Sequence, residues 1–207
     1  MLPPLPERMR PQSLEGYVGQ HHLMGEGCFL RNMIESGNLS SFILWGPPGV
    51  GKTTLSRIVA QSLGREFYTL SAVSSGVKDV RDVIDKARSN SIFSRGLSPI
   101  LFIDEIHRFN KSQQDALLGA VEDGTIVLIG ATTENPSFEL NSALLSRCQV
   151  LILKRLDEKA LEHLILRAEN ELEQKLPLTD GARKNLIAIA DGDGRYLINM
   201  LEMIFDF

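Results

Sequence analysis

The sequence has few aromatic residues, only two cysteines and no excess of positive charge. Aromatic side chains make up 6% of the 207 residues, so a platform that stacks nucleic-acid bases is not expected. Cys28 and Cys148 lack metal-ligand spacing, and both are expected to be buried thiols in a reducing compartment. The formal net charge of −4 argues against a protein whose whole surface is positively charged for binding nucleic acid.

Long apolar runs are also missing. No run approaches the ~20 residues that a membrane-spanning helix requires, and the start lacks the apolar stretch of a signal peptide. These absences predict a cytoplasmic protein that has no membrane partner. Residues 156–207 carry 6 Lys/Arg and 11 Asp/Glu, which leaves 16 basic and 15 acidic residues before them. A DNA contact is therefore expected from a local patch in residues 1–155, or from chain outside this sequence.

Apolar runs typical of strands alternate with helical patterns over residues 1–155. The runs are 42–45, 66–71, 99–104, 126–131 and 150–153, and the helical patterns are 53–63, 77–87, 112–121 and a short one at 143–147. Strict alternation of strand and helix indicates crossover connections and a parallel sheet. The runs are almost continuously apolar, as expected of strands covered on both faces. The sequence therefore predicts an α/β domain with a five-stranded parallel sheet and flanking helices.

Strand patterns stop after Leu156, and three helical patterns follow. Residues 157–174 carry an apolar stripe, Thr179 is a candidate N-cap for a helix that ends near Ala190, and a third helix begins at Arg195. We expect a small all-helical domain over residues 156–207, after the α/β domain at residues 1–155. The third helix is not capped before the sequence stops, which is typical of a truncated chain.

A glycine-rich loop between the first run and the first helix carries the strongest motif. Residues 46–54 fit G-x-x-x-x-G-K-[ST], in the strand–loop–helix setting that the motif requires. Glycines let successive N–H groups turn toward a phosphate at the start of a helix, and the lysine adds a positive charge. The alternative is a turn that only connects strand to helix. The residues expected to bind a nucleoside triphosphate are Pro47, Pro48, Gly49, Val50, Gly51, Lys52, Thr53 and Thr54.

Two carboxylates follow the third run. Asp104 and Glu105 come directly after four apolar residues, and ligands bind at that edge of an open parallel sheet. We expect Thr53 and Asp104 to hold Mg²⁺, and Glu105 to polarise the attacking water. An acidic strand end that only caps a helix is the alternative. His107 extends the motif and is expected to be a structural coupling residue rather than a catalytic one.

Two further polar groups are candidates for the same chemistry. Thr133 follows the fourth run, and its hydroxyl could contact the γ-phosphate or the water, or it could only cap the strand. Arg147 ends a short helical stretch, where an isolated arginine is usually a surface salt-bridge residue. Its catalytic interpretation depends on the motifs that precede it.

These four motifs, in this order, resemble those of AAA+ ATPases. The triplet Ser146-Arg147-Cys148 is similar to that of the clamp-loader branch, and this implies that Arg147 reaches the ATP of a neighbouring subunit. Arg195, after Gly192-Asp-Gly, resembles the arginine that touches the γ-phosphate from within the same chain. The segment around Tyr17 and Val18 is similar to one that packs on the adenine. The resemblance implies ATP and Mg²⁺ as cofactors.

The literal matches at residues 105–115, 121–126 and 130–147 closely resemble the replication-associated recombination protein A family. This resemblance implies a DNA-stimulated ATPase of the bacterial cytoplasm and nucleoid, which acts at stalled forks and gaps and assembles as a homo-tetramer. The resemblance to clamp-loader-like assemblies, in which the corresponding helix faces the central channel, makes Arg108 and Lys111 candidate contacts with the DNA backbone, although both could be ordinary surface residues. The family continues into a helical oligomerisation domain that this chain does not reach. Single-strand-binding protein and other replisome proteins are the implied protein partners.

Two alternative functions remain open from the sequence, and a third is not supported. One is a clamp-loader-like subunit, and another is a recruitment factor that ATP switches between two partner affinities. A P-loop kinase would require an acceptor-binding insertion, and the sequence contains no recognisable one.

Overall fold

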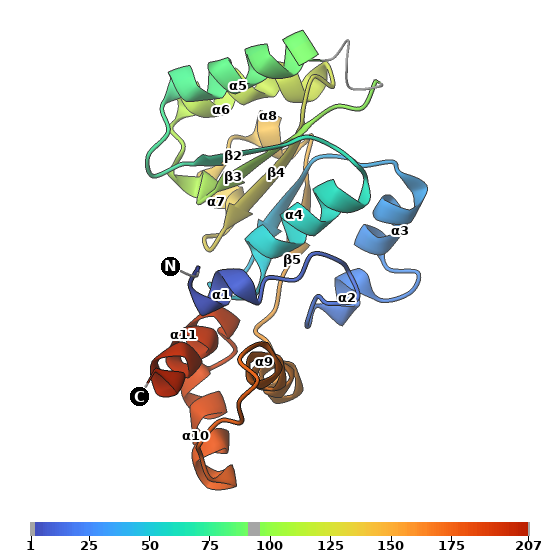
Figure 1. The fold of residues 1–207 in the computed structure, drawn as a ribbon. Helices are drawn as coiled ribbons and strands as arrows, with labels where there is room; N and C mark the ends of the chain where they lie inside the picture. Colours follow the sequence, from blue (N-terminus) through green and yellow to red (C-terminus); the bar gives the residue numbers. More distant parts are fainter. Residues whose placement is uncertain (1–2, 91–95, 207) are drawn as a thin grey trace.

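Five parallel strands form one sheet in the computed structural model, which describes residues 3–90 and 96–206 (Figure 1). The strands lie in the order β2-β3-β4-β1-β5. Their bounds are β1 Phe42–Trp45, β2 Phe67–Ser71, β3 Ile100–Asp104, β4 Val127–Thr132 and β5 Gln149–Ile152. All four pairings are parallel. The predicted sheet is confirmed, and each predicted strand boundary is correct to within one residue.

Helices cover both faces of the sheet (Figure 1). One face packs against α3 (Phe29–Ser36) and α4 (Lys52–Ser62), and the other packs against α5 (Val77–Asn90), α6 (Lys111–Glu122) and α8 (Ser142–Leu145). Successive strand residues alternate between the two cores because side chains alternate across a strand. This alternation explains why the strands are apolar at nearly every position.

Short elements complete the sheet-containing part of the molecule. The helix α2 (His21–Met24) precedes α3, the 3₁₀ helix η1 (Ile106–Arg108) follows β3, and α7 (Pro136–Glu139) follows β4. Gly130 lies opposite η1, where an added Cβ would approach Ile106 Cδ1 to 2.9 Å. The glycine therefore allows η1 to pack closely on β4.

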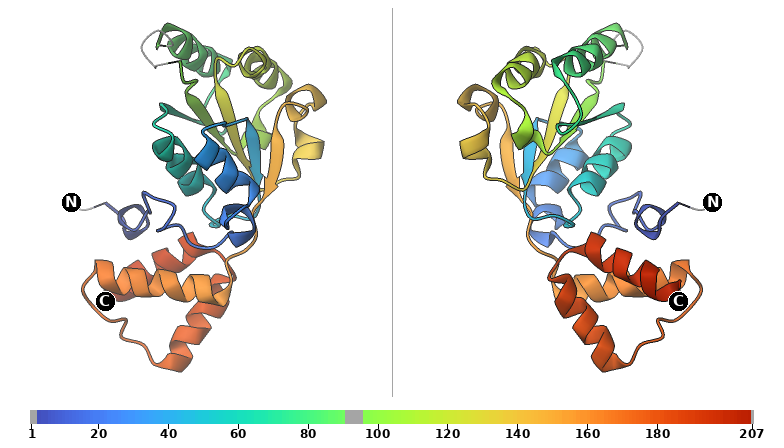
Figure 2. Two further views of the ribbon diagram at one scale, coloured as in Figure 1. Left: turned by 90° about the vertical axis from the view of Figure 1, so that its right-hand side faces the viewer. Right: turned by 90° about the vertical axis from the view of Figure 1, so that its left-hand side faces the viewer.

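Three C-terminal helices form a separate group at one end of the molecule (Figure 2). They are α9 (Glu158–Glu171), α10 (Asp180–Ala190) and α11 (Gly194–Phe205), and they pack around their own apolar cluster. Thr179 caps α10, since its side chain accepts a hydrogen bond from the Ala182 N–H at 3.3 Å. Within the described residues, no helix is long and apolar enough to cross a membrane.

The N-terminal helix α1 (Leu5–Arg8) packs with this C-terminal group (Figure 1). Leu5 and Met9 are buried in the same cluster as α9–α11, and the Leu5 N–H donates to Glu202 Oε1 at 2.7 Å. Arg167 of α9 donates to the carbonyl oxygens of Met9 and Gly16 at 2.8 and 2.7 Å. The start of the chain therefore lies between the sheet and the C-terminal helices.

Candidate functional site

A cleft of about 410 Å³ opens where the carboxyl ends of β1, β3 and β4 face the C-terminal helices. It is lined by residues from α1, the segment before α2, the loop after β1, the ends of β3 and β4, α9 and α11. Of the predicted residues, Pro48, Gly49, Val50, Gly51, Lys52, Thr53, Thr54, Tyr17, Val18, Asp104, Glu105, Thr133 and Arg195 line this cleft, whereas Pro47 and Arg147 do not.

The loop that joins β1 to α4 has the conformation of an anion-binding loop. Gly49 and Gly51 adopt positive φ values of 69° and 97°, which favour glycine because L side chains crowd the backbone there. Gly51 precedes α4, and among the described residues no side chain caps its first turn. The N–H groups of that turn and the helix dipole therefore remain available to an anion such as phosphate.

Lys52 is the first residue of α4, directly after this loop, and only 8% of its surface is exposed. Its Nζ donates hydrogen bonds of 2.7 Å to the carbonyl oxygens of Gly46 and Pro47, so Pro47 contributes through its backbone. Burial lowers the pKa of Lys52 below its ordinary value, and the nearby carboxylates of Glu105 and Asp104 oppose that shift. The ammonium is thus partly desolvated, and acidic residues that line the same cleft lie near it.

Asp104 and Glu105 sit where β3 ends. Asp104 lies two residues after Phe102, which packs in the α3/α4 core, so strand alternation directs Asp104 toward α4 and the loop. Glu105 has a left-handed backbone, with φ 54° and ψ 42°, and begins the 3₁₀ helix η1. Such strain in a non-glycine residue tends to occur at functional sites.

The two threonines at the end of β4 point in different directions. Thr133 lines the cleft, as predicted. Thr132 is fully buried, and its Oγ1 lies 2.9 Å from His107 Nδ1. The other ring nitrogen, Nε2, lies 3.3 Å from Glu105 Oε2. His107 therefore joins the ends of two neighbouring strands, as its predicted coupling role requires.

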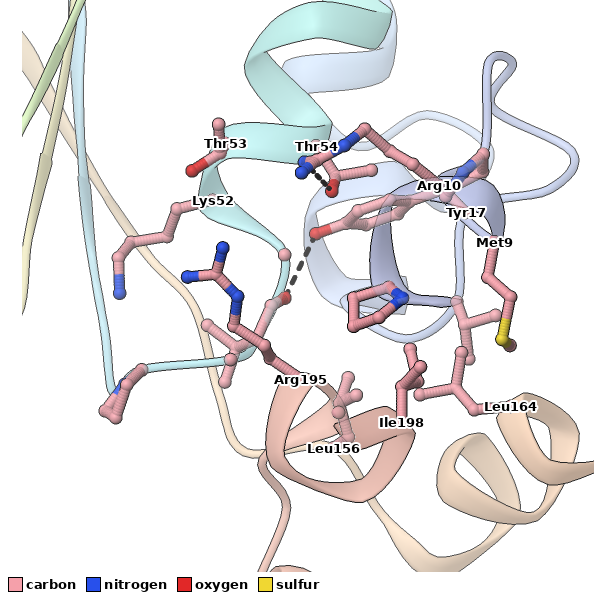
Figure 3. A pocket seen from close by; sticks show the side chains of 18 of the residues that line it. Met9, Arg10, Tyr17, Lys52, Thr53, Thr54, Leu156, Leu164, Arg195 and Ile198 are labelled. Atoms are coloured by element: carbon pink, nitrogen blue, oxygen red, sulfur yellow. Dashed lines mark hydrogen bonds between the residues drawn. The ribbon is translucent and has the colours of Figure 1, made fainter. Parts of the chain in front are cut away.

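The first turn of α11 touches the phosphate-binding loop. The Gly194 N–H donates to the Gly49 carbonyl at 3.0 Å, and a Cβ added at Gly49 would overlap the Asp193 carboxylate. Arg195 follows directly, and Figure 3 shows its side chain extending from α11 toward the loop that carries Lys52. The C-terminal helices therefore place one acidic and one basic group beside the loop.

The other end of the cleft is largely apolar (Figure 3). Tyr17 and Val18 were expected to form a slot for the adenine, and both line it. The Tyr17 hydroxyl donates to the Val50 carbonyl at 3.3 Å, and burial raises the pKa of this phenol. The remaining apolar walls are Met9, Leu156, Leu164 and Ile198. The apolar side chains at this end could pack against a weakly polar group.

Several lining residues were not identified from the sequence. Leu164 and Ile198 belong to the apolar stripes of their helices, and such stripes do not distinguish a core residue from a ligand contact. Arg10 donates to Thr54 Oγ1 at 3.1 Å and also pairs with Glu7 at 2.6 Å. Arg10 lies within the segment, containing Tyr17, that resembles an adenine-packing segment, but the resemblance assigned no role to Arg10 itself.

Arg147 lies outside the cleft, two residues after α8 ends. Its guanidinium donates to the Ala143 carbonyl at 2.7 Å and to Ser146 Oγ at 3.0 Å, and it forms an ion pair with Glu122 at the end of α6. Within the described residues of one chain, Arg147 is thus a surface salt-bridge residue. It does not contribute to the cleft of its own chain.

Comparisons with known proteins agree with this geometry. Residues 42–156 match the sequence profile of the ATPase family associated with various cellular activities (AAA). The replication-associated recombination protein A of Coxiella burnetii is 52% identical over 99% of this chain and 47% of its own length. ATPase WRNIP1 of Dictyostelium discoideum is 52% identical over 97% of this chain and 23% of its own length. The chain thus spans less than half of these curated relatives.

Among solved structures, the Thermotoga maritima RuvB Holliday junction branch migration motor superposes with a TM-score of 0.77. It is 31% identical, and the match covers 96% of this chain and 66% of that one. The expected resemblance to AAA+ proteins and to the replication-associated recombination protein A family is confirmed. The sheet, the loop and the matched family profile together show that this chain belongs to the AAA family of ATPases.

Proposed function

We propose that this chain binds Mg·ATP in the cleft and hydrolyses it. The observation that carries the proposal is the convergence of Lys52, Glu105, Thr133 and Arg195, from four separate elements, around one cavity. Lys52 and the loop N–H groups bind the phosphates, and Glu105 orients the water. Thr133 and Arg195 would contact the γ-phosphate. The apolar end, with Tyr17 and Val18, receives the adenine.

The residues beside the loop fit a magnesium ion. Thr53 offers a hydroxyl and Asp104 a carboxylate, and Mg²⁺ in nucleotide sites takes such oxygen ligands together with phosphates and waters. When bound, the ion neutralises phosphate charge. Lys52 and Arg195 add positive charge at the same end of the cleft, which favours attack by water at a crowded anionic centre.

A second copy of the chain completes the site in this proposal. Arg147 is exposed and lies outside its own cleft, which supports a role at the ATP of a neighbouring subunit. An arginine supplied in trans typically accelerates hydrolysis by about 10³–10⁵. We infer a homo-tetramer for the longer proteins that this chain resembles, and only slow hydrolysis for an isolated copy.

The likeness to replication-associated recombination protein A supports a role at replication forks, in recombination and repair, in the bacterial cytoplasm and nucleoid. Arg108 and Lys111 are exposed, and they follow Asp104 and Glu105 closely along the chain. We propose that they contact the DNA backbone near single-strand/double-strand junctions. DNA binding would then act on the strand end that carries the catalytic carboxylates. Single-strand-binding protein and other replisome proteins are the proposed protein partners.

The decisive experiment measures ATPase rate against protein concentration, with and without gapped or forked DNA. The expected rate per chain rises with concentration and with DNA, because both bring Arg147 to a neighbouring site. Arg147→Ala should remove that rise and leave ATP affinity unchanged. Rapid hydrolysis by a strictly monomeric sample, or an Arg147→Ala variant that retains the rise, contradicts the trans assignment.

A further inference from the structure

The candidate base, Glu105, is held from two sides. Its backbone is left-handed where β3 ends. Its N–H donates a hydrogen bond to Asp104 Oδ1 at 3.2 Å, which restrains the backbone at this residue. Its carboxylate lies 3.3 Å from His107 Nε2, on a side chain with 13% of its surface exposed. A carboxylate that must align a water gains from such a contact, because small misplacements of reacting groups are costly.

The other side of the His107 ring meets the end of β4. Strand alternation places Thr132 on the face that Leu128 shares with η1, while Thr133 falls on the side of the cleft. Thr132 Oγ1 accepts a hydrogen bond from the Glu134 N–H at 3.0 Å. Its own proton has two acceptors within reach, His107 Nδ1 at 2.9 Å and the Glu134 carbonyl at 3.2 Å.

The direction of the Thr132 hydroxyl determines which nitrogen of a neutral His107 carries the proton. If Thr132 donates to Nδ1, the ring proton sits on Nε2 and can be donated to Glu105. If Thr132 donates to the Glu134 carbonyl, Nδ1 becomes the donor to Thr132, and Nε2 presents a lone pair to the carboxylate. The first arrangement holds Glu105, and the second repels it.

We propose that His107 is a positioning residue that links the end of β4 to Glu105 through its Nε2–H tautomer. This inference rests on the proposed ATPase function. Thr133 lines the cleft and lies between Thr132 and Glu134 in the chain, so a change at the γ-phosphate end of the cleft alters the Thr132–Glu134 turn. The contacts from Thr132 through His107 to Glu105, here called the relay, pass that change to the carboxylate on the neighbouring strand. His107 itself does not line the cleft.

Paired substitutions separate positioning from structural support. The His107→Gln amide can replace Nε2 as the donor to Glu105, whereas the shorter His107→Asn side chain reaches only the Thr132 side. We expect His107→Asn to lower kcat about 10- to 100-fold, the range for a misplaced catalytic group, with ATP affinity changed less than about 2-fold. His107→Gln should recover most of that loss. Thr132→Val should resemble His107→Asn, and Thr132→Ser should resemble the unmodified chain.

The rates are measured at the protein and DNA concentrations at which the unmodified chain turns over fastest. His163→Asn, an exposed histidine change on α9, is the matched control and should have no effect. Equal rates for the Gln and Asn variants, or an affinity loss that parallels the rate loss, overturn the relay. If Glu105→Gln leaves the rate of the unmodified chain unchanged, the proposed ATPase site is wrong instead.

A spectroscopic test does not depend on turnover. The ¹⁵N shifts of the imidazole nitrogens distinguish the two neutral tautomers, and the chain has only 4 histidines to assign. The expected result for His107 in the nucleotide-free chain is the Nε2–H form. A protonated Nδ1 with an unprotonated Nε2 overturns the proposal whatever the ATPase rates are.

Discussion

At the scale of single residues, the phosphate-binding loop is followed by a buried positive charge that destabilises the fold when no anion is bound. Lys52 is buried, and its partners are the two neutral carbonyl oxygens of Gly46 and Pro47. Burial lowers its pKa, which means that the fold disfavours the charged form. Bound phosphates would add counter-charge to that of the nearby carboxylates, which only partly offset the burial. The residue is thus expected to favour binding more than folding.

Lys52→Met keeps the length of the side chain and removes its charge. We expect ATP affinity to fall about 10- to 100-fold, as for the loss of a charge-assisted hydrogen bond, while the free energy of unfolding without nucleotide stays equal or rises. Isothermal titration with ATP and urea unfolding measure the two quantities. A variant that loses stability and affinity together would indicate a structural role instead.

The same lysine predicts a pH dependence. Its folded pKa lies below the ordinary value of 10.5, so between these two values the unfolded chain holds more protons than the folded chain. Stability contributed by Lys52 therefore rises with pH in that window and is lowest at neutral pH. Urea unfolding at about pH 8 and about pH 10 measures the free energy of unfolding of both chains. The excess stability of Lys52→Met over the unmodified chain should be smaller at the higher pH.

At the scale of secondary-structure elements, α6 and α8 hold Arg147 in place. The ion pair with Glu122 joins the end of α6 to the second residue after α8, and both side chains are partly exposed. An exposed ion pair contributes about 0–1 kcal/mol, so the pair restrains Arg147 weakly. An arginine that reaches a neighbouring subunit has to exchange this partner for phosphate.

Glu122→Gln should release Arg147. We expect the ATPase rate of the assembled protein to rise about 2- to 5-fold, the population change that an ion pair of up to ~1 kcal/mol can impose, with unchanged ATP affinity. Glu122→Gln combined with Arg147→Ala should be as slow as Arg147→Ala alone. An equal gain in the double variant would show that Glu122 acts on something other than Arg147.

The apolar end of the cleft also depends on elements far apart in the chain, since Tyr17 faces α9 and α11 across it (Figure 3). Tyr17→Phe removes only the hydroxyl that donates to the Val50 carbonyl, so ATP affinity should stay within about 3-fold. Tyr17→Ala removes the ring and should weaken ATP binding about 10-fold or more, as expected for the loss of a buried apolar contact. A larger loss for Tyr17→Phe than for Tyr17→Ala contradicts the proposed adenine slot.

At the scale of the whole molecule, the C-terminal helices contact the phosphate-binding loop directly. The Gly194 N–H donates to Gly49, and the Leu156 N–H donates to the Gly192 carbonyl at 3.1 Å, so backbone bonds join the two parts at the cleft. Asp193 caps α11 through the Tyr196 N–H at 2.8 Å, and its carboxylate touches Gly49. A negative charge therefore stands where the phosphates are proposed to bind.

Asp193→Asn keeps a capping side chain and removes that charge. We expect ATP to bind at least about 5-fold more tightly, since a carboxylate near phosphate costs Coulomb energy even at a high effective dielectric constant. Thermal stability should change little, because asparagine caps helices as well as aspartate does. Weaker ATP binding by this variant would mean that the carboxylate helps to organise the site rather than oppose the anion.

Local pattern predicted the elements and the nucleotide-binding motif. The backbone geometry of these features depends on residues only a few positions away in the sequence. This holds for the apolar runs, for residues 46–54 and for the carboxylates at 104–105. The five strands and their helices accordingly lie within a few residues of the predicted boundaries. Thr179 was also predictable, because capping depends on the first turn of one helix.

Only the tertiary structure determined which of these elements and side chains contact one another. The strand order places β4 between β3 and β1, and only that order brings Thr132 to His107, 25 residues away in the chain. The packing of α1 on α11 and the pairing of Arg147 with Glu122 likewise join segments that are distant in sequence. Sequence therefore determined the local conformation and the chemical groups, whereas long-range packing determined the relay, the apolar slot and the position of Arg147. The physical reason is that side-chain contacts between separate elements depend on how whole faces are buried, and no short pattern encodes that.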